Sequence, residues 1–335
     1  MDAPAHSRLS SRALRRLTVA LVAFSSTAIL ALGLFSLTPS GSLGSLRSPL
    51  AAPKHSQGQA SCQASPDIWD AARLKYRNLS DDKFTVALQT YHRERELAET
   101  LGVLLNTSIP SLLEVVVVWN DPDTTPPGDF ASPHGVPVRY RHSPRNSLNE
   151  KLWPDPAYQT QAVLLSDDDV YYRPDDLEFV FQTWRKFGRH RLTGALARCA
   201  APRPDGSWEY SFCSRDAGND AYSMILTNLA FAHVSLMDYY SSDDPAAQRV
   251  RSYVDDHFNC EDIALNFLAS MLTGDGPLLV QGHERYVNME PAQGISRKPH
   301  HLEARSRCLS DLADILACMP LVNETAHVER GVVPL

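Results

Sequence analysis

An apolar run, Ala162–Ser166, leads directly into three consecutive aspartates, and this junction restricts the folds open to the chain. The run has the length of a buried strand, so Asp167, Asp168 and Asp169 are expected where that strand ends. Side chains alternate along an extended segment, which would point Asp167 and Asp169 to one side and Asp168 to the other. At most one or two carboxylates would then bind a hard cation, leaving coordination positions free for a diphosphate. An acidic turn after a buried strand is the alternative interpretation.

Strands and helices alternate through the first half of the chain. Short apolar runs predict strands at Phe84–Gln89, Leu113–Trp119, Val136–Tyr140 and Ala162–Ser166. Helical spacing of apolar residues predicts helices at Arg93–Leu105 and Asp175–Phe187. This alternation is typical of an α/β fold with a mostly parallel sheet, in which ligands bind beyond the carboxyl ends of the strands.

The second half of the chain differs in pattern from the first. Strands are predicted at Arg191–Arg198, Trp208–Phe212 and Ala221–Leu229, with a turn around Pro204–Gly206. Helices are predicted at Ala246–Asp256, Glu261–Met271 and His300–Leu316.

The N-terminal region predicts a membrane anchor. Residues 17–37 carry no charge over a length that crosses a bilayer, and four arginines precede them. Basic residues on this flank hold it in the cytosol, which gives a single-pass type II topology with the rest of the chain lumenal. A cleaved signal peptide is the alternative.

Three sequons and six cysteines suit the secretory pathway. Asn78, Asn106 and Asn323 begin glycosylation triplets, and the cysteines can pair in an oxidising lumen, although spacing alone does not fix their partners. Neither a CxxC motif nor a His/Cys zinc spacing is present. The net charge of −7 excludes a general nucleic-acid-binding surface.

Polar residues gather at the predicted strand ends of the first half. Amides there can recognise a base and ribose, and the basic side chains can neutralise phosphate oxygens. The residues concerned are Gln89, Arg93, Asn120, Asn146, Asn149 and Lys151. Ordinary turn and helix-cap chemistry is the alternative for each asparagine taken singly.

Six separated motifs resemble, in their order, the exostosin-type glycosyltransferase domain of family 64. They are FTVALQTYHR at 84–93, VVVVWN at 115–120, NSLN at 146–149, SDDD at 166–169, NCEDIALNF at 259–267 and RSRC at 305–308. The resemblance spans about residues 83–321. It implies a GT-A fold, in which a Rossmann-like nucleotide-binding half with a mixed sheet is joined to an acceptor-binding half.

The resemblance also implies a reaction and a set of site residues. Members use a nucleotide-sugar donor with Mn²⁺, for which Mg²⁺ is a possible substitute, and they retain the anomeric configuration. By matching positions, the nucleotide would contact Gln89, Arg93, Asn120 and Asn146, with Asn149 and Lys151 beside them. Asp167 and Asp168 would lie around the ribose and the donor sugar, and Asp169 would be the metal ligand. Relatives often have Asn-Arg where this chain has Glu150 and Lys151, and lysine lacks the planar fork of arginine.

The remaining motifs imply the catalytic residues. Asp262 matches the acidic catalytic-site residue of the family, while Glu261 stands where animal relatives often have aspartate. Arg305 matches an arginine near the leaving diphosphate, where positive charge would stabilise the departing group. Helix-start carboxylates and a solvated arginine are the plain alternatives. The family pairing of cysteines would join Cys260 to Cys308.

The expected protein is a retaining, Mn²⁺-dependent transferase that moves one sugar, expected to be an N-acetylhexosamine, from a UDP-sugar to a glycan or glycolipid. It would be anchored in the Golgi or endoplasmic reticulum membrane, with a homodimer possible. The expected organisation is a cytosolic tail at 1–16, an anchor at 17–37, a stem at 38–81, the transferase domain at 82–325 and a tail at 326–335. Two alternatives are a catalytically silent sugar-nucleotide-binding subunit of a transferase complex and, less favoured, a metal-dependent phosphoesterase.

Overall fold

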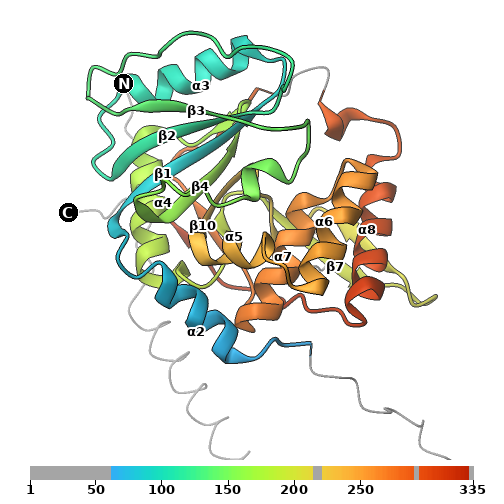
Figure 1. Ribbon diagram of the computed structural model, residues 1–335. Helices are drawn as coiled ribbons and strands as arrows, with labels where there is room; N and C mark the ends of the chain where they lie inside the picture. Colours follow the sequence, from blue (N-terminus) through green and yellow to red (C-terminus); the bar gives the residue numbers. More distant parts are fainter. Residues whose placement is uncertain (1–61, 214–220, 290–293, 332–335) are drawn as a thin grey trace, which may run out of the picture. The chain divides into compact units, whose positions relative to one another are not determined.

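An eight-stranded sheet lies at the centre of the computed structural model, which describes residues 62–213, 221–289 and 294–331 (Figure 1). The strand order is β13-β11-β6-β10-β4-β1-β2-β3. In chain order the strands are β1 (Ser80–Thr90), β2 (Leu112–Trp119), β3 (Val138–His142), β4 (Thr160–Asp167), β6 (Thr193–Gly194), β10 (Leu229–His233), β11 (Leu278–Gln281) and β13 (His327–Glu329). Only β10 runs antiparallel to its neighbours, which confirms the predicted mixed, mostly parallel sheet of an α/β fold.

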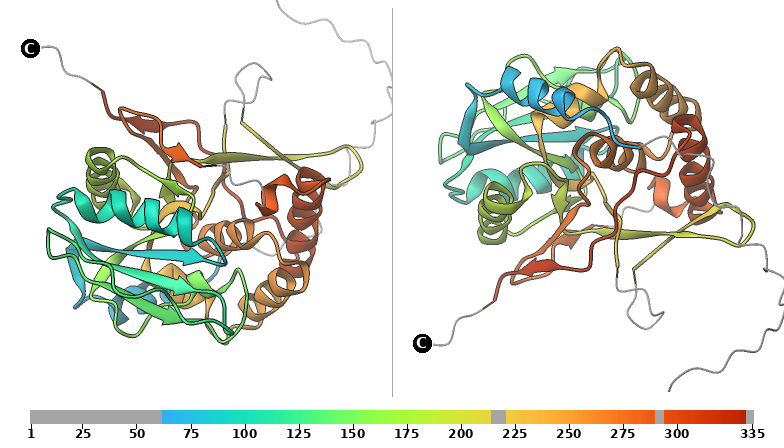
Figure 2. Two further views of the ribbon diagram at one scale, coloured as in Figure 1. Left: turned by 90° about the horizontal axis from the view of Figure 1, so that it is seen from above. Right: turned by 90° about the horizontal axis from the view of Figure 1, so that it is seen from below.

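Helices cover both faces of this sheet. The helices α3 (Glu94–Asn106) and α4 (Pro174–Thr183) lie on one face, and α5 (Val234–Tyr240) lies on the other (Figure 2). Helices α2 (Pro66–Lys75) and α7 (Glu261–Thr273) pack against α5. A further pair, α6 (Pro245–His257) and α8 (His301–Leu316), packs beside α7.

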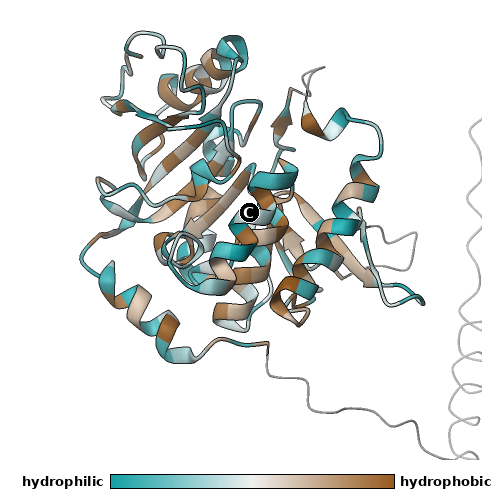
Figure 3. Cartoon of the chain, turned by 45° about the vertical axis from the view of Figure 1, so that its right-hand side comes forward, coloured by the Kyte–Doolittle hydropathy of each residue, from teal (hydrophilic) through white to brown (hydrophobic). Residues whose placement is uncertain are grey.

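Two hydrophobic cores, one on each face, explain the continuous apolar runs of the central strands. On β1, Phe84, Val86 and Leu88 pack into the core under α3 and α4, whereas Ala87 packs into the core on the opposite face. A strand buried on both faces has no reason to alternate polar and apolar residues. Apolar residues accordingly fill the strands and the inner sides of the helices, and polar residues cover the outer sides (Figure 3).

The predicted elements of the first half are confirmed with small changes at their ends. The four strands are β1, β2, β3 and β4. The first helix is α3, which buries Leu97, Leu101, Leu104 and Leu105. The second predicted helix, 175–187, is α4 followed by a π-helical turn at Trp184–Gly188. Three pieces of this half were not predicted: helix α2, a 3₁₀ turn at Glu150–Leu152 and the strand β5 (Val170–Tyr171), which pairs with β12 (Val287–Asn288).

Two strands predicted in the second half are wrong. The run 191–198 is not one strand, because Thr193–Gly194 joins the main sheet as β6 whereas β7 (Ala197–Pro202) begins a second sheet. The run 221–229 also divides, since β9 (Met224–Ile225) pairs with β7 and β10 starts only at Leu229. Each apolar run crosses from one sheet to the other, which its composition does not reveal.

The hairpin of the second sheet follows the prediction. β8 (Trp208–Ser211) pairs antiparallel with β7, and the turn between them is closed by Gly206 N–H donating to the Arg203 carbonyl. Gly206 has φ of +87°, a conformation that glycine adopts without the steric cost of a Cβ. The helices predicted at 246–256, 261–271 and 300–316 are confirmed as α6, α7 and α8. A 3₁₀ turn at Ile295–Arg297 precedes α8.

Two elements of the fold lie outside the range 82–325 predicted for the transferase domain. Helix α2 packs on α5 and α7, and β13 pairs with β11 at the edge of the main sheet. The predicted membrane segment, 17–37, lies outside the described residues. Among the helices that the structure does describe, none has the length and apolar character needed to cross a bilayer.

Candidate active site

The Asp167–Asp169 triplet lies at the carboxyl end of β4, level with Gln89 at the end of the neighbouring strand β1. Because β4 ends at Asp167, the next two aspartates lie in a turn and not in the extended segment that the prediction assumed. Arg93 Nη1 donates to both of them, to Asp168 Oδ1 at 2.9 Å and to Asp169 Oδ2 at 2.7 Å. Asp168 is buried and also accepts a hydrogen bond from Thr90 Oγ1 at 2.7 Å.

Burial, with a smaller contribution from neighbouring carboxylates, raises the pKa of two aspartates of the triplet. Burial raises the pKa of Asp168 to about 7, against the opposing effect of Arg93. Burial and the charge of Asp167 also raise the pKa of Asp169. Burial makes negative charge costly here, so a divalent cation beside Asp169 and Asp167 fits the electrostatics of this turn. Among the residues that the structure describes, this triplet included, no three His, Cys, Asp or Glu side chains are grouped so that they could hold a metal ion.

Lys151 connects this turn to the other half of the molecule. Its side chain is only 1% exposed, and Nζ lies 2.6 Å from Asp167 Oδ1 and 3.8 Å from Glu261 Oε1. Burial alone would lower the pKa of Lys151, but the charges of Asp167 and Glu261 outweigh burial and raise it. The lysine is therefore a buried cation between carboxylates of β4 and α7.

Asp262 and Arg305 form a buried ion pair next to this lysine. Asp262 lies in the first turn of α7, and its Oδ2 accepts a hydrogen bond from Nη2 of Arg305 on α8. Arg305 also donates to Asn259 Oδ1 at 3.3 Å, and its Cζ lies 4.6 Å from the centre of the Tyr210 ring. Burial would raise the pKa of Asp262, but Arg305 outweighs burial and lowers it.

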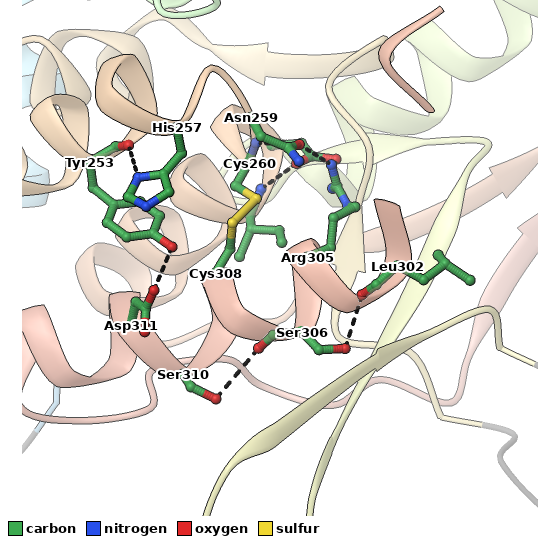
Figure 4. Close-up of a disulfide and its surroundings, with 12 residues drawn as sticks. Tyr253, His257, Asn259, Cys260, Leu302, Arg305, Ser306, Cys308, Ser310 and Asp311 are labelled. Atoms are coloured by element: carbon green, nitrogen blue, oxygen red, sulfur yellow. Dashed lines mark hydrogen bonds and ion pairs between the residues drawn. A yellow bond between two sulfur atoms is a disulfide. The ribbon is translucent and has the colours of Figure 1, made fainter. Parts of the chain in front are cut away.

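The Cys260–Cys308 disulfide holds this ion pair in place. It joins the residue before α7 to the middle of α8, two residues from Asp262 and one helical turn from Arg305 (Figure 4). The pairing implied by the resemblance is therefore confirmed. The other two disulfides, Cys62–Cys318 and Cys199–Cys213, assign the four cysteines that the sequence left open.

Three of the four predicted amides meet around one loop. Gln89 Nε2 donates to the Ser147 carbonyl at 2.8 Å, and Asn120 Nδ2 donates to Asn146 Oδ1 at 2.8 Å. Asn149 is placed differently. Its side chain is fully buried, donates to the Arg251 carbonyl and accepts from the Tyr240 hydroxyl, so its amide serves the packing of this loop against α5 and α6.

Several residues of the site escaped the sequence analysis. Thr90 and Tyr210 touch Asp168 and Arg305, but a threonine or a tyrosine inside a strand has no signal that separates it from a packing residue. Glu261 was noted only as a departure from the family pattern. It lies beside Lys151, another of the departures, and burial together with the charge of Asp262 raises its pKa to about 7.

Comparison with known proteins shows the family of the chain. The family model for the glycosyl transferase family 64 domain matches residues 84–332. The chain belongs to glycosyltransferase family 64. It is 32% identical to Exostosin-like 2 of Mus musculus over 253 residues, which cover 72% of this chain and 74% of that protein. The resemblance predicted from the six motifs is thus confirmed.

Longer relatives match over part of their length. Exostosin-2 of Homo sapiens is 31% identical over 243 residues, which are 71% of this chain and 33% of that protein. Glucosamine inositolphosphorylceramide transferase 1 of Arabidopsis thaliana is 35% identical over 240 residues, which are 70% of this chain and 30% of that protein. This glycosyltransferase chain therefore spans about a third of the length of Exostosin-2.

Proposed function

We propose that this family 64 protein transfers a sugar from a UDP-linked donor, a UDP-N-acetylhexosamine, to a glycan or glycolipid acceptor with retention of configuration, on a GT-A type fold. The observation that carries the proposal is Lys151. Its buried ammonium group links Asp167 of the triplet to Glu261, which neighbours the Asp262–Arg305 pair. The Asp167–Asp169 triplet, which is suited to a metal diphosphate, and the Asp262–Arg305 pair therefore belong to one site.

The nucleotide-binding residues are assigned from their positions at the strand ends. Gln89, Asn120 and Asn146 meet around the loop at Ser147, where their amides can recognise the base and ribose. Arg93 holds Asp168 and Asp169 in place. Asp169 would bind Mn²⁺, which supplies positive charge to the diphosphate.

Retention fits attack on the same face as the leaving group. The bond from the sugar C1 to the diphosphate oxygen breaks and its electron pair leaves with the phosphate. The acceptor hydroxyl oxygen then bonds to C1, and its proton passes to the released phosphate oxygen. Arg305 would stabilise the departing charge, and Asp262 would orient the acceptor and support positive charge on the sugar.

The secretory pathway suits the same proposal, with the chain anchored by residues 17–37 in the Golgi or endoplasmic reticulum membrane. All three sequon asparagines, Asn78, Asn106 and Asn323, are exposed. Every cysteine is paired, as an oxidising lumen allows.

The test is a donor and acceptor panel with purified protein and Mn²⁺. UDP- and GDP-sugars are scored for nucleotide release with and without glycans and an inositolphosphorylceramide, which the Arabidopsis relative's name suggests. Transfer from one UDP-sugar should disappear in Asp169→Ala and in Asp262→Asn but persist in the exposed control Asp129→Ala. Asp262→Asn should still bind the donor. If the protein binds UDP but turns over no combination of donor and acceptor, the alternative of a catalytically silent sugar-nucleotide-binding subunit would be favoured instead.

A further inference from the structure

Strand β8 runs along helix α8 in a regular ladder. The backbone N–H of Trp208 donates to Ser310 Oγ at 2.9 Å, and that of Tyr210 donates to Ser306 Oγ at 3.0 Å. Two residues of β8 thus span the same distance as four residues of α8, because both segments are about 6 Å long. β8 ends at Ser211, and one further step of the same spacing would bring Phe212 level with Leu302.

Phe212 and Leu302 are both exposed, unlike the residues at the earlier steps. They are 59% and 43% exposed, and they belong to the few large apolar side chains of the described residues that face solvent. The Arg198 guanidinium carbon lies 4.4 Å from the centre of the Phe212 ring. The Cys199–Cys213 disulfide fixes the backbone next to Phe212. An apolar ring is therefore held open to solvent in a fixed place.

The two side chains lie beside the Asp262–Arg305 pair. Leu302 precedes Arg305 by three residues on α8, so both belong to the same side of the helix. Tyr210, two residues before Phe212 on the strand, packs under the Arg305 guanidinium. The exposed apolar surface is thus the rim of the site next to its catalytic arginine.

We propose that Phe212 and Leu302 form the platform on which the acceptor sugar rests, with the apolar face of a pyranose ring against the free face of Phe212. Pyranose rings present C–H groups on one face, and an aromatic ring whose other side is covered by a cation offers them a flat apolar partner. The inference rests on the proposed function, since it takes the Asp262–Arg305 pair as the place of transfer.

Saturation-transfer NMR on the full chain tests this platform. The probes are p-nitrophenyl glucoside, galactoside, N-acetylglucosaminide and glucuronide, added to protein with UDP and Mn²⁺. At least one should bind the unmodified protein, and its affinity should fall about tenfold in Phe212→Ala. Phe212→Tyr should restore binding, because it keeps the ring, and Leu302→Ala should give a smaller loss.

Phe187→Ala is the matched control, because Phe187 is 60% exposed on a different part of the fold and its removal should leave binding intact. Equal binding by Phe212→Ala and the unmodified protein would overturn the platform, as would absence of binding by every probe. Calorimetry of UDP with Mn²⁺ separates the two proposals. Absence of UDP binding by the unmodified protein would count against the proposed transferase. Normal UDP binding, together with unchanged probe affinity in Phe212→Ala, would count against the platform alone.

Discussion

Lys151 and Glu261 are two of the three positions at which the chain departs from the family pattern described above, and these two face each other. Lys151 Nζ lies 3.8 Å from Glu261 Oε1 in a region where the lysine is 1% exposed. A glutamate side chain extends one carbon further than an aspartate, which brings its carboxylate toward the ammonium group. The two departures are therefore one feature of this site, a buried charge pair between its halves.

Removing the cation should cost stability. Lys151→Met leaves Asp167 and Glu261 without their shared partner, and the free energy of unfolding at pH 7 should fall by about 3 kcal/mol. The double variant Lys151→Met/Glu261→Gln should recover part of this loss because one uncompensated carboxylate is gone. Urea denaturation measures all three proteins. The exposed Lys186→Met should change little, and an equally small effect of Lys151→Met would show that the pair contributes no stability.

Glu261 should make stability depend on pH. Its pKa is raised from 4.5 to about 7, first by burial and then by the charge of Asp262. Between these two values the folded protein keeps a proton that the unfolded chain releases, so the glutamate's contribution to stability falls as pH rises. From pH 5 to pH 8 the unmodified protein should lose about 1–3 kcal/mol relative to Glu261→Gln in denaturation experiments. The exposed Glu94→Gln serves as the control, and parallel curves for Glu261→Gln and the unmodified protein would contradict the assignment.

Among the elements, the parallel strands of the first half could be predicted because each is buried on both faces and reads as one apolar run. The runs 191–198 and 221–229 were each wrongly predicted as one strand for a related reason. An apolar residue type indicates burial, but it does not indicate in which sheet the residue lies. Both runs pass from one sheet to the other part-way along their length. Tertiary pairing decides such breaks.

The same distinction applies to the site. Asp167, Asp168 and Asp169 could be singled out because three carboxylates directly after an apolar run are conspicuous, whereas Asp262 and Arg305 were assigned only through the family resemblance. Tyr210 and Thr90 could not, because their contacts with Arg305 and Asp168 arise only when distant elements meet. The amide of an asparagine gives no signal of whether it faces a ligand or, as in Asn149, a neighbouring helix.

Helices α7 and α8 carry the two members of the ion pair, and the Cys260–Cys308 disulfide should matter for function as well as stability. Its cysteines are 48 residues apart, and loop-closure entropy gives a contribution of about 4 kcal/mol, against about 3 kcal/mol for Cys199–Cys213 with a separation of 14. Cys260→Ala/Cys308→Ala should lower kcat as well as stability, because it frees the α7 start that holds Asp262.

The matched variant is Cys199→Ala/Cys213→Ala, which should lose stability and weaken acceptor binding, with kcat preserved at saturating acceptor. Denaturation and steady-state kinetics on both double variants give the comparison. An unchanged kcat without Cys260–Cys308 would mean that packing alone positions the ion pair.

At the scale of the whole molecule, the Cys62–Cys318 disulfide closes the described chain from near its start to the segment after α8, a separation of 256 residues. It holds the approach to α2, which otherwise depends on Trp69 in the core and on the Tyr76 hydroxyl donating to Asp238 at 2.7 Å. The Ala64 N–H also donates to the Met271 carbonyl, near the end of α7.

Asp262 lies at the other end of α7, about 13 Å away along the helix. Cys62→Ala/Cys318→Ala should therefore loosen α2 without disturbing the site. Backbone hydrogen exchange should quicken in Pro66–Lys75 and stay slow at the start of α7, while kcat remains within about twofold of the unmodified protein because the Asp262–Arg305 geometry is untouched. A matching rise in exchange around Asp262 would show instead that this disulfide supports the whole second core, since α2, α5 and α7 would then open as one cooperative unit.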